Sequence, residues 1–280
     1  MSNKKLKIGM AQLLVEGGEP ERNFERASAK ITEAVEKGCQ LVLFPETIDF
    51  AWTHPSSLKE ARGIPGPFSN HFCEEAAKHG IYICVGLTEK AGNGKHYNAA
   101  ILINPKGEII LKHHKINLLE VEFPFYEVGQ SLGVVDTEWG TIGLNICADN
   151  YQDSLTLGHS LARMGAQLIL SPSSWTVDYS ITEEDDPYED KWVKPLSDLA
   201  RLYGIAVVST TSVGYIVGGP YEGKKKVGCS LAVNKDGIIA QGQFNEFAGE
   251  LIVAEIEIPE RSEKGTQIGE RLKKEGYQFG

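Results

Sequence analysis

The sequence predicts an α/β fold in which two β-sheets pack face to face and helices cover their outer faces. Three features support this fold: wholly apolar runs typical of strands covered on both sides, amphipathic segments with helical spacing, and several hairpins joined by turn residues. Residues 41–44 are such an apolar run, and residues 20–38 are such a helix. Neither a repeat nor a linker interrupts the sequence, so we expect one domain over 1–258 and a polar, charged tail over 259–280.

The elements expected in the first part of the chain alternate between strands and helices. Strands are predicted at 5–13, 41–44 and 81–87, and helices at 20–38 and 68–79. Hairpins, further strands and two more helices follow: strand pairs at 97–104 with 108–114, 132–136 with 141–147, and 227–234 with 237–241, strands at 167–171, 205–211 and 250–258, and helices at 154–164 and 192–203.

Composition excludes several classes of protein. The 280 residues are 41% hydrophobic and 24% charged, as in ordinary globular proteins, and the net charge of −10 argues against binding to nucleic acid or to an anionic membrane. Lys224 to Lys226 form the single basic triplet, which we interpret as a solvated hairpin loop. No secretory signal or stretch of transmembrane length is evident. Five cysteines without paired spacing indicate a reducing compartment, so we expect a cytoplasmic protein.

Three polar residues follow apolar runs. Glu46 comes after the run 41–45, Lys115 after the strand that contains 109–111, and Cys147 after 142–146. Strands of one sheet that end in these residues would place a carboxylate, an ammonium group and a thiol in one cleft, where the two charges compensate each other. We expect the helix after Cys147 to favour its thiolate through the helix dipole.

The chemistry of these groups suggests their roles. A thiol with a reference pKa of about 8.5 is mostly protonated at neutral pH, so it needs a base, and Glu46 is the candidate. Lys115 and the backbone N–H of Ala148 are candidates to stabilise an oxyanion. The other cysteines lie in apolar patterns and are interpreted as core residues. The adjacent His113 and His114 would point to opposite faces of a strand, so they cannot bind one metal ion together.

The sequences Phe44-Pro45-Glu46, His114-Lys115-Ile116 and Asn145-Ile146-Cys147-Ala148-Asp149 resemble the three signature regions of the nitrilase superfamily, the carbon–nitrogen hydrolases. The likeness extends from Lys5 to about Ile258, which is nearly the whole chain. It implies a four-layer α-β-β-α sandwich and a Glu-Lys-Cys triad that hydrolyses a non-peptide C–N bond through a thioester. By spacing, the family's second glutamate falls on Glu122, with Glu120 as a rival.

The resemblance also suggests how substrate is bound. Trp175 lies on a segment that resembles a pocket wall of the family, and Asn150 and Tyr151 could offer amide hydrogen bonds and an aromatic face. Many members that act on ω-amides or carbamoyl amino acids have an arginine shortly after the cysteine, whereas residues 148–153 contain none. A small acidic substrate is therefore less favoured. We expect a small linear amide or N-carbamoyl compound, with no cofactor and no metal.

Several alternatives stay open at this point. The triad is compatible with a true nitrilase, and a non-catalytic binding homologue is the alternative from another class. A metal-dependent phosphoesterase would need a set of Asp, His and Asn ligands that the strand ends lack. The acidic run Glu183 to Asp186 is interpreted as a solvated loop, or as a lid that favours cationic substrates. Family members usually pair, so a homodimer or higher homo-oligomer is implied, with 259–280 as a possible contact arm.

Overall fold

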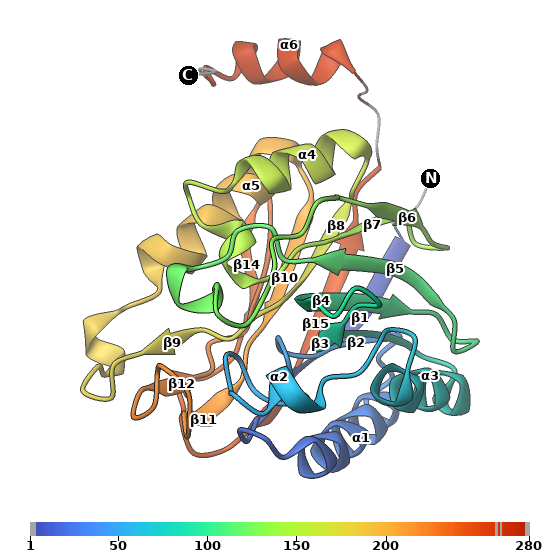
Figure 1. The fold of residues 1–280 in the computed structure, drawn as a ribbon. Helices are drawn as coiled ribbons and strands as arrows, with labels where there is room; N and C mark the ends of the chain where they lie inside the picture. The colour runs from blue at the N-terminus through green and yellow to red at the C-terminus, as the bar shows by residue number, and fades with distance from the viewer. Residues whose placement is uncertain (1–3, 261–262, 264, 278–280) are drawn as a thin grey trace.

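The computed structural model describes residues 4–260, 263 and 265–277. Two six-stranded sheets face each other, and helices cover the outer face of each. In Figure 1, α1 (Pro20–Glu36) and α3 (Pro67–His79) lie along one outer side, and α4 (Thr156–Met164) and α5 (Lys194–Tyr203) along the other. This arrangement confirms the predicted four-layer α-β-β-α sandwich.

The first sheet carries the N-terminal half of the chain and the last strand. Its order is β15-β1-β2-β3-β4-β5, in which β1, β2 and β3 are parallel and the other neighbours are antiparallel. The bounds are β1 (Lys4–Gln12), β2 (Leu41–Leu43), β3 (Tyr82–Lys90), β4 (His96–Ile103), β5 (Ile109–His114) and β15 (Glu250–Ile258).

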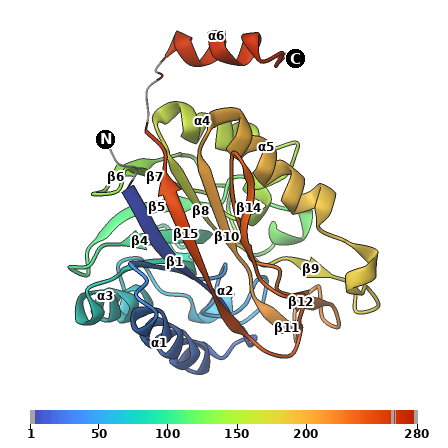
Figure 2. The same ribbon diagram turned by 180° about the vertical axis from the view of Figure 1, so that it is seen from behind.

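The second sheet has a similar plan. Its order is β14-β13-β10-β8-β7-β6, with β7, β8 and β10 parallel. A small sheet, β11-β12-β9, lies at one end of the sandwich (Figure 2). The bounds are β6 (Val134–Asp136), β7 (Thr141–Leu144), β8 (Leu168–Pro172), β9 (Thr176–Val177), β10 (Ala206–Thr210), β11 (Val213–Tyr215), β12 (Lys225–Val227), β13 (Leu231–Asn234) and β14 (Gly237–Gln241).

The apolar patterns of the sequence match these layers. The central strands β2, β8 and β10 are buried along their whole length, as expected for parallel strands covered on both faces. Helix α5 turns Leu196, Leu199 and Ala200 inward, and all three belong to the core between the sheets and α4 and α5. A second core fills the space between the first sheet and the helices α1 and α3.

Helix α4 begins at Thr156, two residues after the predicted start at Ser154, and the 3₁₀ turn Cys147–Asn150 lies between Cys147 and this helix. Another local expectation is corrected by the structure. The predicted strand 227–234 is broken at Gly228 and Cys229, which both have positive φ. Lys225 and Lys226 precede this break in β12 and are buried, so the basic triplet is not the solvated loop that we expected.

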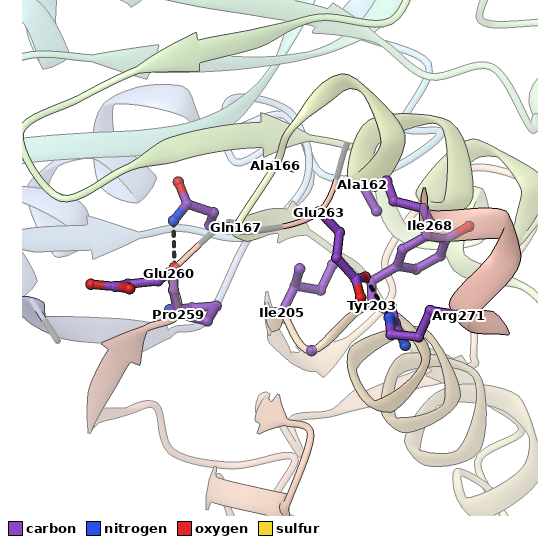
Figure 3. Close-up of a pocket in the computed structure, with 11 residues that line it drawn as sticks. Ala162, Ala166, Gln167, Tyr203, Ile205, Pro259, Glu260, Glu263, Ile268 and Arg271 are labelled. Atoms are coloured by element: carbon purple, nitrogen blue, oxygen red, sulfur yellow. Dashed lines mark hydrogen bonds and ion pairs between the residues drawn. The ribbon is translucent and has the colours of Figure 1, made fainter. Parts of the chain in front are cut away.

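The C-terminal tail contains the helix α6 (Thr266–Lys274), which follows β15 and contacts its own chain. Ile268 and Leu272 are buried, and the Arg271 guanidinium donates to the carbonyl of Leu202 after α5. Figure 3 shows the small cavity between this tail and α4 and α5, where Glu263 pairs with Arg271. The predicted role of 259–280 as a contact arm stays a prediction. None of the described helices is long and apolar enough to span a membrane.

Candidate active site

The three predicted triad residues come from two sheets rather than one. Glu46 follows β2 and Lys115 follows β5 in the first sheet, whereas Cys147 follows β7 in the second. All three strands run in the same sense and the sheets face each other, so their carboxyl ends meet at one end of the sandwich. The backbone N–H of Glu46 donates to the carbonyl of Ser173, which follows β8, and this bond joins the two sheets beside the site.

Lys115 is held between two carboxylates in the interior. Its Nζ lies 2.9 Å from Oε1 of Glu46 and 3.0 and 2.9 Å from the two carboxylate oxygens of Glu122. The side chains of all three residues are completely buried. Glu120, the rival candidate, is exposed at the start of the 3₁₀ turn Glu120–Glu122. The geometry therefore places Glu122, and not Glu120, beside Lys115.

Further donors fix the positions of the two glutamates. The Asn98 amide donates to Glu46 at 2.5 Å and to Glu122 at 3.3 Å, and the indole N–H of Trp52 donates to Glu122 at 2.8 Å. Sequence analysis did not identify either residue. Asn98 was a detectable signal, because it is a polar residue directly before the apolar, buried run Ala99 to Ile103 of the same strand.

Burial and charge set the protonation states. Burial opposes the charge of Lys115, but the attraction of Glu122 and Glu46 outweighs it, so the pKa of Lys115 is raised and the ammonium stays protonated. Burial raises the pKa of Glu46, although Lys115 opposes the shift. Oε2 of Glu46 has no hydrogen-bond partner among the described residues, which leaves one carboxylate oxygen free to accept a proton.

Cys147 occupies a strained backbone position at the end of β7. Its φ of +46° is in the left-handed region, which a residue with a side chain adopts only when the surrounding structure enforces it. Burial raises the pKa of the thiol, and the negative charge of Glu46 adds to this effect. Burial thus opposes the thiolate that the helix dipole was expected to favour, and this agrees with the expectation that the thiol needs a base.

Asp149 holds the elbow in place. Its Oδ2 accepts from the N–H of Ile146 at 2.9 Å and lies 2.9 Å from Nε2 of His113. Its Oδ1 accepts from the N–H groups of Ile116 and Asn117 at 3.1 and 2.7 Å. The carboxylate thus ties the turn that carries Cys147 to the segment directly after Lys115. Sequence analysis gave this residue no role.

A family model described as carbon–nitrogen hydrolase matches residues 7–263, which is nearly the whole chain. The chain belongs to this family. The match confirms the resemblance that the three signature regions indicated.

Individual relatives of this carbon–nitrogen hydrolase match a smaller part of the chain than the family model does. The omega-amidase NIT2 of Xenopus tropicalis is 30% identical over 182 residues, which cover 62% of this chain and 65% of the relative. A nitrilase of Pyrococcus abyssi is 31% identical over 180 residues, or 62% of this chain and 67% of that one. The chain thus spans slightly less than two thirds of the omega-amidase that it matches.

A solved amidase from Nesterenkonia sp. AN1 superposes with a TM-score of 0.75 at 19% identity and covers 90% of both chains, which confirms the fold. Another structure of that amidase shows covalent addition of the acetamide moiety of fluoroacetamide at its active-site cysteine.

Two side chains hold the backbone at Ala148 by donating hydrogen bonds to its carbonyl oxygen. Asn117 and Ser154 both donate to the oxygen of Ala148, at 2.7 and 2.6 Å. At the start of a helical turn the first N–H groups have no acceptor within the turn, so the Ala148 N–H is oriented without an intrahelical partner. This geometry suits the predicted oxyanion-stabilising role in a carbon–nitrogen hydrolase.

Asn150 differs from the other predicted substrate contacts because its amide is already occupied. Its Nδ2 donates to Asn145 at 3.0 Å and to Ser171 at 2.9 Å, and its Oδ1 accepts from Asn145 at 2.6 Å. The side chain is buried and links the elbow to β8. Asn150 thus supports the backbone behind Cys147 and has no amide group left for a substrate.

Trp175 and Tyr151 both contact Trp192, which sequence analysis had assigned only to a helix. The rings of Trp175 and Trp192 stack with centroids 4.5 Å apart, and the Tyr151 ring lies 4.9 Å from Trp192. Tyr188 joins this aromatic cluster, 5.4 Å from Trp175. The cluster belongs to the same core as Cys147. Nε1 of Trp175 and Oη of Tyr188 are buried and have no partner among the described residues.

The acidic run does not reach the catalytic residues. Glu183, Glu184 and Asp185 are exposed on a short 3₁₀ turn, whereas Tyr188 from the same loop is buried in the aromatic cluster.

The side chains of His113 and His114 point to opposite faces of β5, as expected. His113 contacts Asp149 as described above, and His114 lies 2.5 Å from Glu89 on the other face of β5.

Proposed function

We propose that this protein hydrolyses a non-peptide C–N bond of a small linear amide or N-carbamoyl compound through a thioester on Cys147. The observation that supports the proposal is a buried carboxylate, Glu46, whose charge acts on the buried thiol of Cys147 and whose Oε2 has no partner among the described residues. A protonated thiol is a weak nucleophile, and an adjacent base with a raised pKa is what activates it. Lys115 and Asn98 both bind the other oxygen of Glu46, Oε1, so Oε2 takes no part in the hydrogen bonds that hold Lys115.

The proposed reaction begins when Glu46 takes the thiol proton and the sulfur of Cys147 attacks the carbonyl carbon. Lys115 and the Ala148 N–H stabilise the oxyanion that forms. The C–N bond breaks as Glu46 returns its proton to the leaving nitrogen, which departs as ammonia or an amine. Water then attacks the thioester, Glu46 accepts its proton, and the sulfur leaves as the regenerated thiol. One amide and one water give one acid and one amine.

The test combines turnover with mass spectrometry of the intact protein. We expect the wild-type protein to release ammonia from at least one member of a panel of amides, N-carbamoyl amines, N-carbamoyl amino acids and nitriles. Rapid quenching should trap an acyl adduct on Cys147, and Cys147→Ala should lose both turnover and adduct while keeping its thermal unfolding midpoint. Turnover by Cys147→Ala would contradict the mechanism. Turnover of nitriles alone would assign a nitrilase instead, and an unmodified Cys147 across the panel would favour a binding homologue.

A further inference from the structure

The segment 46–53, which runs from the proposed base to just beyond the Trp52 indole, has an unfavourable backbone conformation. Thr47, Ala51 and Thr53 all have positive φ, of +45°, +66° and +59°. Residues with a side chain seldom adopt this left-handed region, and for a β-branched threonine it is a clear outlier. Contacts with the rest of the protein must therefore hold the segment in place.

Both ends of the segment 46–53 contact the catalytic network. At its start, Oε1 of Glu46 lies 2.9 Å from Nζ of Lys115. Near its end, the indole N–H of Trp52 donates to Glu122 at 2.8 Å. Any shift of the segment would therefore move the proposed base relative to the ammonium group, and would also move a donor to the second glutamate.

Asp49 lies in the middle of the segment and ties it to β3. Its Oδ1 accepts from the N–H of Phe50 at 3.0 Å, and its Oδ2 accepts from the N–H of Thr88 at 2.8 Å. The hydroxyl of Thr88 lies 3.4 Å from Oδ1. One carboxylate thus binds a backbone N–H inside the strained segment and another in a strand of the first sheet.

The neighbouring part of β3 approaches the same segment closely. The N–H of Ile48 donates to the carbonyl of Gly86 at 2.9 Å, and the N–H of Gly86 donates to the carbonyl of Pro45 at 3.2 Å. A Cβ atom at Gly86 would lie 2.6 Å from Cα of Glu46, so this approach requires glycine. Backbone contacts therefore seat the proposed base on β3, and Asp49 adds a side-chain contact to them.

Asp49 is completely buried without a cation. Among the described residues, the hydrogen bonds to its carboxylate come from backbone N–H groups and a hydroxyl, and none comes from a lysine, arginine or histidine. Burial raises the pKa of Asp49 to about 7, although the N–H groups of Thr88 and Phe50 oppose the shift. A buried carboxylate without an ion pair is unfavourable. The position that it gives to the segment 46–53 explains this residue better than a gain in stability does.

We propose that Asp49 is a positioning residue that holds the carboxylate of Glu46 in the arrangement required for proton transfer from Cys147. Asp49 exchanges no proton with the substrate and acts through the segment 46–53. This inference rests on the proposed function, because it takes Glu46 as the base. A displacement of about 1 Å can lower a catalysed rate by roughly 10²-fold, so loss of the Asp49 contacts should be visible in kcat.

Asp49→Asn keeps the shape of the side chain but removes one of its two acceptor oxygens. Either the Phe50 N–H or the Thr88 N–H then faces an amide donor. We expect kcat to fall by roughly 10- to 100-fold and KM to stay within about threefold, because the change moves the base and leaves substrate binding intact. Alkylation of Cys147 by a neutral reagent should slow as well, because a displaced Glu46 accepts the thiol proton less readily. All rates are measured below the unfolding midpoint of each variant.

Thr88→Val is the matched control. It removes the hydroxyl beside Asp49 but keeps the backbone N–H that binds Oδ2, so kcat and the alkylation rate should stay at their wild-type values even if the unfolding midpoint falls. Asp49→Ser is the second variant, for use if Asp49→Asn does not fold. Its short side chain leaves the Thr88 N–H without an acceptor, so it should show the same loss of kcat.

Two kinds of result would overturn the inference. Wild-type kcat and alkylation in the Asp49 variants, with only a lower unfolding midpoint, would make Asp49 a purely structural residue. An equal loss of kcat in Thr88→Val would assign the effect to local packing instead. Failure of the proposed function looks different: the wild-type protein would then hydrolyse no member of the substrate panel, whereas slower alkylation of Cys147 in Asp49→Asn would still support the positioning of Glu46.

Discussion

The Nζ atom of Lys115 lies 2.9 Å from Oε1 of Glu46, and this contact leaves Oε2 of the same carboxylate without a partner among the described residues. The two oxygens of Glu46 therefore have separate tasks. One is fixed by Lys115 and Asn98, which orients the carboxylate, and the other is available for the proton of a thiol. Because the Lys115 ammonium stays protonated, it can stabilise an oxyanion without exchanging its own proton.

Glu46→Gln should remove the base but keep most of the hydrogen-bonding shape of the side chain. We expect kcat/KM to fall by about 10²- to 10⁴-fold, the usual contribution of general acid–base catalysis. The rate of Cys147 alkylation by a neutral reagent should fall as well, because the thiol loses its proton acceptor. Steady-state kinetics and mass spectrometry check both effects. Activity within a few fold of wild type would remove Glu46 from the mechanism.

Glu122→Gln and Glu120→Gln form a matched pair. Glu122 bonds Lys115, Trp52 and the Leu119 N–H, so Glu122→Gln should lower the free energy of unfolding by about 1–3 kcal/mol and reduce kcat. Glu120 is exposed, so Glu120→Gln should change stability by less than about 0.5 kcal/mol. Urea unfolding and turnover separate the two. A larger effect of Glu120→Gln would reverse the assignment.

Trp175→Phe tests the indole N–H rather than the ring. The substitution should keep most of the contact with Trp192 but remove the buried Nε1 donor that has no described partner. If this donor binds substrate, KM should rise by about 5- to 20-fold, the value of one neutral hydrogen bond, with little change in stability. Trp192→Ala should instead destabilise the protein by about 3–5 kcal/mol because it empties the cluster. An unchanged KM in Trp175→Phe would make Trp175 a packing residue.

Asp149→Asn should loosen the elbow without touching the triad. The carboxylate accepts bonds from three backbone N–H groups and contacts His113, and an amide can accept from only part of this set. We expect a loss of about 2–3 kcal/mol in stability, as for buried bonds to a charged group, and a lower kcat with little change in KM. Thermal unfolding and kinetics measure these effects. A selective change in KM would point to substrate contact instead.

Lys226 should make stability depend on pH in alkaline solution. Its pKa is about 8 in the folded protein and 10.5 as the reference for the unfolded chain, so between these values the unfolded state binds more protons. The free energy of unfolding should therefore rise with pH over this window, by roughly 3 kcal/mol in total. Lys226→Met should remove that rise, whereas Lys224→Met should keep it. Urea titrations from pH 7.5 to about pH 10.5 test this. An identical pH slope in Lys226→Met would show that Lys226 is not a buried cation.

The order of elements and the triad were readable from local patterns. Apolar runs such as 41–44 and 142–146 predict strands, and the polar residue after each run marks a strand end, which is where sites of α/β proteins lie. Glu46, Lys115 and Cys147 were identified in this way. The predicted homo-oligomer, the cytoplasmic location and the arm role of 259–280 stay predictions.

Contacts between distant segments could not be predicted in the same way. Trp52 lies in the loop after β2, Asn98 in β4, and Glu122 in the 3₁₀ turn η1 (Glu120–Glu122). These residues meet only because the three segments pack together. Asn150 has a polar side chain typical of a binding residue, yet the packing of β7 against β8 uses up its amide. Spacing along the chain carries no information about such pairs, since their separation in sequence is set by the topology of the sheets.

The sequence by itself determined the chemistry: a thiol, a carboxylate and an ammonium group at strand ends, in the order typical of carbon–nitrogen hydrolases. Only the tertiary structure decided how these groups are tuned. Burial between the sheets raises the pKa of Cys147 and so adds to the need for a base that its reference pKa already indicated. The pairing of β12 with β9 and β11 buries Lys226, which the sequence alone indicated to be solvated. Desolvation depends on every atom that surrounds a charge, and that environment exists only once the two sheets have packed.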